Sequence, residues 1–117
     1  MAKEQEVEKF LKEFREKMKI WDALFRDERG KNTQALADLE LCPADRKKIL
    51  EEIESTDYSE GPLEEKLYGG GDMWVFGKEI KQQEVYIKIS IGFAGASVIC
   101  ISFHIAEHPM NYPLKKR

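Results

Sequence analysis

Several features are missing from this sequence, and each absence excludes a class of protein. No apolar run in the 117-residue chain reaches 18 residues, which argues against a transmembrane helix. The first ten residues, MAKEQEVEKF, are charged and lack the apolar segment of a signal peptide. The two cysteines, Cys42 and Cys100, lack CxxC spacing, so neither a disulfide framework nor a zinc site built on thiolates is expected. We therefore expect a cytoplasmic protein with reduced, buried thiols.

The chain also lacks an excess of positive charge. Its formal net charge of −3, taken as a uniform average, argues against a protein that binds nucleic acid mainly through electrostatics. The charge is not uniform, because residues 1–71 hold 13 basic and 18 acidic side chains, whereas residues 72–117 hold six basic and four acidic ones. A polyanionic ligand would therefore meet the C-terminal part of the chain.

The first 55 residues are predicted to be mainly helical. Apolar residues recur at helical spacing over residues 3–19, and a short edge strand is expected over 21–26. A second helix would be capped by Asn32 or Thr33 and end before Pro43. Pro43 then suits the first position of a third helix, whose buried stripe would be Ile49, Leu50 and Ile53. The second and third helices are expected to form a hairpin that covers a sheet.

Residues 72–104 are predicted to form an antiparallel sheet. Three strands are expected over 73–78, 84–91 and 97–104, and their short connections predict a meander. Residues 56–71 contain a Gly-Pro pair and three consecutive glycines, so they are predicted to be a loop, and residues 105–117 a tail that folds back over the sheet. The expected fold is a single α+β domain, with N-terminal helices on one face of a C-terminal antiparallel β-meander.

Period-2 alternation divides the last two strands into two faces. The expected core face carries Val85, Ile87, Ile89, Ile91, Ile99, Ile101 and Phe103. The other face carries Tyr86, Lys88 and Ser90 with Val98, Cys100, Ser102 and His104. A hairpin centred near Ala94 would place Tyr86 opposite Ser102 and Lys88 opposite Cys100. This second face is either an ordinary solvent-exposed sheet surface or a functional site.

The second face carries the groups that metal-independent RNA cleavage needs. Such a reaction requires a group that takes the proton of the ribose 2′-hydroxyl, a cation for the phosphorane, and an acid for the leaving 5′-oxygen. Tyr86 can position or deprotonate the hydroxyl, Lys88 can hold the phosphate, and His104 can act as the acid. Secondary candidates for substrate binding are Ser102, Lys78 as a phosphate contact, and Trp74 as a stacking surface, for which packing in the core is the alternative interpretation.

A zinc site is the alternative that the sequence raises for His104. The residues His104, Glu107 and His108 match the pattern HxxEH, which binds zinc when a helix presents both histidines on one side. Here the pattern follows a strand directly and Pro109 comes next, so no metal or other cofactor is expected.

The order and spacing of these segments resemble the MqsR (motility quorum-sensing regulator) family of toxins. The resemblance runs from Asn32 to His104 and is carried by KNTQALADLEL, DYSEGP, MWVFGKEIKQQEVYIKI and VICISFH. It implies a RelE-like α+β fold and an mRNA interferase of a type II toxin–antitoxin system, which needs no metal and is silenced by a cognate antitoxin. The family's tyrosine and the lysine after it fall on Tyr86 and Lys88.

Other family positions differ in this chain. The family lysine that closes the last strand falls on His104, a further lysine falls near Gly61 and has no equivalent, and a glutamine falls on Val75. These differences favour a second hypothesis, in which the same face binds RNA or a protein partner without catalysis. The primary prediction is an endoribonuclease whose partners are mRNA and an antitoxin protein.

Overall fold

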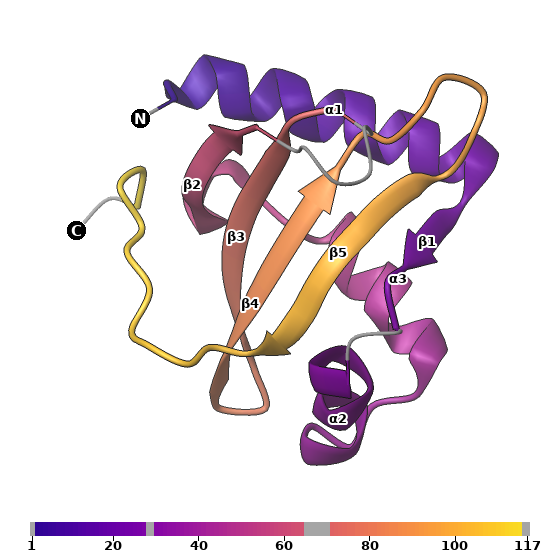
Figure 1. Cartoon of the computed structure of the whole chain (residues 1–117). Helices are drawn as coiled ribbons and strands as arrows, with labels where there is room; N and C mark the ends of the chain where they lie inside the picture. Colours follow the sequence, from indigo (N-terminus) through magenta and orange to yellow (C-terminus); the bar gives the residue numbers. More distant parts are fainter. Residues whose placement is uncertain (1, 28–29, 65–70, 116–117) are drawn as a thin grey trace.

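A five-stranded sheet with the order β1-β5-β4-β3-β2 organises the molecule (Figure 1). The computed structural model describes residues 2–27, 30–64 and 71–115. The strands are Ala23–Phe25 (β1), Tyr58–Leu63 (β2), Met73–Ile80 (β3), Gln83–Ser90 (β4) and Val98–Ile105 (β5). The helices are Glu4–Trp21 (α1), Gly30–Asp38 (α2) and Pro43–Glu51 (α3), with a 3₁₀ turn at Ser55–Asp57 (η1). All strand pairs are antiparallel except β1 with β5, so the predicted α+β class and the β3-β4-β5 meander are confirmed.

Helix α1 lies across one face of the sheet because it carries an apolar stripe at helical spacing (Figure 1). The stripe is buried and consists of Val7, Phe10, Leu11, Phe14 and Met18. The Phe10 ring stacks on the Trp74 ring of β3 with centroids 4.7 Å apart. The strands present Trp74, Phe76, Val85, Ile87, Ile89 and Phe103 to this core. The face toward α1 is therefore the apolar face of the sheet.

The N-terminal connection follows the prediction in outline. Helix α1 ends at Trp21 and is capped by Asp22, whose backbone N–H donates to the Met18 carbonyl, and β1 is the short edge strand that was expected. Helix α2 begins at Gly30, so the prediction that Asn32 or Thr33 caps it is wrong. Asn32 lies inside the helix and is buried. Helix α3 begins at Pro43 as predicted, and of its expected stripe Leu50 and Ile53 are fully buried while Ile49 is partly buried.

The prediction that residues 56–71 form a loop is wrong over the first part of that range. Residues Tyr58–Leu63 form β2, which pairs with β3 through irregular register and contains a cis bond between Gly61 and Pro62. The polar and Gly-Pro composition of β2 hides the strand, because proline and glycine are tolerated at a sheet edge next to irregularities. Residues 65–70 of the predicted loop, including Gly69 and Gly70, lie outside the described residues.

The register of β4 against β5 differs from the prediction. Tyr86 lies opposite His104 and Lys88 opposite Ser102, rather than opposite Ser102 and Cys100. The cause is a register shift, since Lys88 pairs with Ser102 and Ile89 pairs with Cys100, which leaves Ile101 as an extra residue in β5. Beyond this bulge the alternation reverses, so Val98 and Cys100 belong to the core with Phe103, while Ile99 and Ile101 do not.

The two cysteines lie in different environments. Both thiols are free, and Cys100 is buried as expected, but Cys42 is exposed because it precedes α3 at the surface. Within residues 2–27, 30–64 and 71–115, no helix has the length and apolar character needed to cross a bilayer.

Candidate functional site

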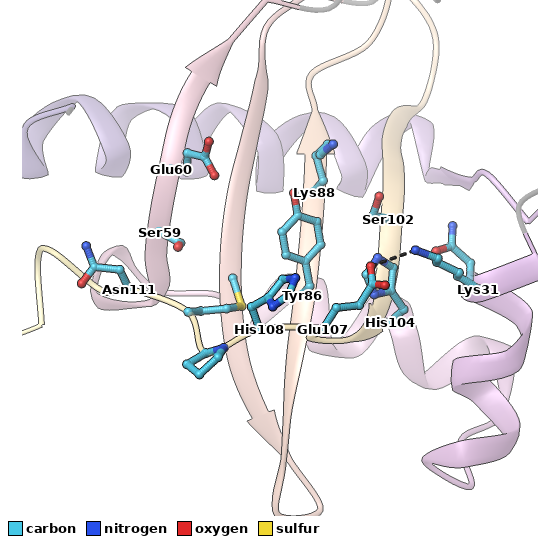
Figure 2. Close-up of a pocket in the computed structure, with 13 residues that line it drawn as sticks. Lys31, Ser59, Glu60, Tyr86, Lys88, Ser102, His104, Glu107, His108 and Asn111 are labelled. Atoms are coloured by element: carbon cyan, nitrogen blue, oxygen red, sulfur yellow. Dashed lines mark hydrogen bonds and ion pairs between the residues drawn. The ribbon is translucent and has the colours of Figure 1, made fainter.

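A cavity of about 730 Å³ opens on the polar face of the sheet, opposite α1 (Figure 2). Four of its lining residues are the predicted polar set on β4 and β5: Tyr86, Lys88, Ser102 and His104. The other lining residues are Lys31, Asn32, Ser59, Glu60, Glu107, His108, Pro109, Met110 and Asn111. The cavity therefore collects side chains from α2, from three strands and from the C-terminal tail.

Tyr86 and His104 form the centre of the site. They face each other across the β4-β5 ladder, and their rings stack with centroids 5.2 Å apart and planes inclined by 14°. Lys88 lies two residues along β4 on the same face, with its Nζ atom 5.8 Å from the centre of the Tyr86 ring. Strand parity thus brings a phenol, an ammonium group and an imidazole together, as the alternation predicts.

The bulge in β5 determines which residues reach this cavity. Asn32 holds the bulge from α2: its Nδ2 donates to the carbonyls of Ile101 and Arg26, and its Oδ1 accepts from the backbone N–H of Phe103. A regular strand ending at the same loop would keep Cys100 and Ser102 on one face. The bulge instead sends Cys100 into the core and leaves Ser102 and His104 facing the cavity. Asn32 is therefore the residue that fixes the local geometry of the site.

The protonation chemistry of His104 follows from one hydrogen bond. The Nδ1 atom lies 2.9 Å from the carbonyl oxygen of Ile105, which can only accept, so Nδ1 carries a hydrogen. In the neutral ring Nε2 is then the site without a proton, and in the charged ring Nε2 holds the proton that can be given away. His104 can therefore exchange a proton through Nε2 in either direction.

The C-terminal tail forms one wall of the cavity, as the predicted fold-back over the sheet requires. The Met110 backbone N–H and the Tyr112 hydroxyl both donate to the Glu84 carboxylate, at 3.1 and 2.6 Å. Burial, and then the hydrogen bond to Glu84, raise the pKa of Tyr112 well above its usual value. Gly77 makes this docking possible, because a Cβ there would overlap the Tyr112 hydroxyl and lie 2.8 Å from Met110 Sδ.

An ion pair joins the tail to α2 at the rim of the cavity. Lys31 Nζ lies 2.8 Å from Glu107 Oε1 (Figure 2). The hydrogen bond from Lys31 and its charge lower the pKa of Glu107, with smaller contributions from His104 and His108. Both side chains are well exposed, so this pair contributes little to stability and mainly shapes the rim.

Two residues predicted to bind substrate lie elsewhere. Trp74 is only 9% exposed and packs against Phe10 on the face covered by α1, so the prediction that it offers a stacking surface is wrong. Lys78 pairs with Asp57 at 3.1 Å and lines a separate hollow with Tyr112, so it does not contact the cavity that contains Lys88. The pairing of β3 with β4 puts both residues on the face of the sheet that is opposite to the face of Tyr86.

Several residues of the cavity could not be recognised from local sequence patterns. Lys31 and Asn32 come from α2, Ser59 and Glu60 from the strand that was predicted to be a loop, and Asn111 from the tail. His108 lies in the predicted tail, and it also lines the cavity. The packing of α2 against β5, the presence of β2 and the path of the tail bring these groups to the site, and none of these follows from local periodicity.

The HxxEH pattern does not build a metal site among the described residues. No group of three or more His, Cys, Asp or Glu side chains is placed to hold a metal ion in that part of the chain. Glu107 is engaged by Lys31, and the Nδ1 atom of His104 is bonded to a carbonyl.

Comparisons with known proteins add no relative: the chain matches no protein-family profile, no curated protein sequence and no solved structure.

Proposed function

We propose that this chain is a metal-independent endoribonuclease of the cytoplasm that cleaves mRNA, related to the MqsR toxins and inhibited by an antitoxin protein. The observation that carries the proposal is the stacked Tyr86–His104 pair with Lys88 beside it in one cavity. These three side chains combine an imidazole that can donate or accept a proton, a phenol and the positive charge of Lys88, and two adjacent strands hold them rigidly. The relationship to the MqsR family is supported by the sequence segments named above.

The proposed reaction is an internal attack by the ribose. The 2′-oxygen bonds to phosphorus, the bond from phosphorus to the 5′-oxygen breaks, and the products carry a 2′,3′-cyclic phosphate and a 5′-hydroxyl. Lys88 stabilises the extra negative charge on the phosphorane oxygens, and Tyr86 orients the 2′-hydroxyl. His104 Nε2 gives a proton to the departing 5′-oxygen.

A second group must accept the proton of the 2′-hydroxyl. His108 is the second imidazole on the cavity, and it is contributed by the tail rather than by the sheet. Two imidazoles in opposite protonation states are sufficient for this reaction, since one accepts a proton while the other donates one. We assign the role of general base to His108, assisted by the Tyr86 hydroxyl.

The proposal is tested by incubating the purified chain with mixed-sequence RNA in excess EDTA. Fragments that end in a 2′,3′-cyclic phosphate are expected from the wild type, and their formation should fall by ~10²-fold or more in Lys88→Ala and His104→Ala. Lys12→Ala is the matched charge control, because Lys12 is exposed on α1, on the other side of the sheet. Retention of intact RNA without cleavage would instead support the non-catalytic binding module.

A further inference from the structure

The cavity has two ends of different chemistry. Lys88 and His104 line the end formed by β4 and β5. Ser59 and Glu60 of β2 and Asn111 of the tail line the other end, across β3 from Tyr86 (Figure 2). A phosphate is favoured near the ammonium group of Lys88 and disfavoured near the carboxylate of Glu60 by simple electrostatics. The β2 end therefore suits an uncharged part of a ligand that donates hydrogen bonds.

Glu60 is the main feature of this end. Its side chain is exposed in the middle of β2, where Glu60 pairs with Val75 between two irregularities of the ladder. Among the described residues, none forms an ion pair or a hydrogen bond with the Glu60 carboxylate. Both carboxylate oxygens thus remain able to accept hydrogen bonds from a ligand.

We propose that Glu60, with Asn111 and Ser59, forms a subsite that binds a guanine base; this rests on the proposed ribonuclease function for the choice of a nucleotide ligand. Guanine is the base whose pairing edge presents two adjacent donors, N1–H and N2–H, beside the acceptor O6. The two oxygens of Glu60 match the donors, and the Asn111 amide or the Ser59 hydroxyl matches O6. Adenine, cytosine and uracil each present at least one acceptor where the carboxylate needs a donor.

The dimensions of the sheet agree with one nucleotide bridging the two ends. Strands β2 and β4 are two ladder spacings apart, or about 10 Å, since neighbouring strands lie about 4.8 Å apart. This is the span from the pairing edge of a nucleotide to its own phosphate. A guanosine with its base at Glu60 would thus place its 3′-phosphate near Lys88 and His104, where the bond would be cut.

The subsite is tested by titrating the full-length chain with 3′-GMP, 3′-IMP and 3′-AMP and measuring binding by NMR. The wild type should bind 3′-GMP about tenfold or more tightly than 3′-AMP, the discrimination expected of one bidentate contact. Inosine lacks the N2 amino group, so 3′-IMP should lie between them. Glu60→Gln should bind all three alike, whereas Glu51→Gln, which removes the same charge on the exposed surface of α3, should keep the preference.

Equal binding of guanine and adenine nucleotides by the wild type would overturn the subsite, and so would an unchanged preference in Glu60→Gln. Failure of the proposed function looks different. If the guanine preference depends on Glu60 but no RNA is cut, the subsite stands and the nuclease proposal falls. If RNA is cut at sites that are the same in the wild type and in Glu60→Gln, the nuclease stands and the subsite falls.

Discussion

His104 and Tyr86 stack across the β4-β5 ladder, 5.2 Å between ring centres, and the imidazole hydrogen of His104 is directed at the Ile105 carbonyl. Each ring is held by a strand rather than by a loop, so the pair is positioned before any ligand binds. The Nε2 atom is the one ring position of His104 through which a proton can be exchanged with a substrate.

Removing the imidazole should stop the reaction and leave the fold intact. We expect His104→Ala to abolish growth inhibition when the protein is expressed, because loss of a proton-transfer group costs ~10² to 10⁴ in rate. The melting temperature should change little, since His104 is only partly buried and lies outside the apolar core. Undiminished toxicity of the variant, at equal expression, would remove His104 from the mechanism.

Asn32 is expected to affect both stability and activity. Asn32→Ala leaves the Ile101 carbonyl and the Phe103 N–H in the bulge without their side-chain partner, which should cost about 2 kcal/mol in the free energy of unfolding. Denaturant titration measures this cost. Thr33→Ala is the control, because Thr33 is exposed on the same helix and should change stability by less than about 0.5 kcal/mol. Similar losses in the two variants would contradict the assigned role of Asn32.

Gly77 is expected to control the docking of the tail. In Gly77→Ala the new methyl group displaces Tyr112, so the tail loses its two hydrogen bonds to Glu84. Amide hydrogen exchange of Met110 should become faster, while the amides of β4 that pair with β5 keep their protection. If Met110 remains as protected as in the wild type, the tail is not held in the way described.

The Tyr112–Glu84 contact gives a prediction for alkaline pH. Because the pKa of Tyr112 is raised in the fold, the protonated phenol is the form that the folded state stabilises. This contribution is present below the ordinary tyrosine pKa of about 10 and is lost as the pH rises through the higher pKa of the folded state. Unfolding measured between about pH 9 and 12 should therefore show, above about pH 10, a steeper loss of stability for the wild type than for Tyr112→Phe. Parallel pH profiles would argue against the contact.

The two thiols should differ in reactivity. Cys42 is exposed, whereas burial raises the pKa of Cys100 far above its usual value and suppresses the reactive thiolate. A disulfide reagent should therefore modify one thiol per native chain and two after denaturation, and Cys42→Ser should leave none reactive in the native state. Rapid modification of both native thiols would show that the β5 core is open.

The periodicity of apolar residues correctly predicted which face of β4 and which face of α1 are buried. The alternation of Val85, Ile87 and Ile89 set the core face of β4, and the stripe from Val7 to Met18 set the buried face of α1. The same alternation placed Tyr86 and Lys88 on the polar face with His104. These predictions hold because burial of one face fixes the parity of a strand and the orientation of a helix.

The bulge in β5, strand β2 and the face on which Trp74 lies depend on tertiary contacts, which the periodicity of the sequence does not show. The bulge at Ile101 depends on the Asn32 amide, which is 69 residues away in the chain, and it reversed the predicted faces of Cys100 and Ile99. Strand β2 has no apolar alternation, so Glu60 was not recognised as part of the site. The parity of Trp74 was open from the sequence and was settled by its stacking on Phe10.

Cleavage by attack of the ribose 2′-hydroxyl is tested most directly with a substrate that lacks this hydroxyl. An RNA oligonucleotide that the wild type cuts is compared, in EDTA, with the same oligonucleotide carrying a single 2′-deoxyribose at the cleavage site. We expect a 2′,3′-cyclic phosphate product from the first oligonucleotide and no cleavage of the second at that position. Cutting of the deoxy-substituted site, or products that end in a free 3′-hydroxyl, would contradict this mechanism.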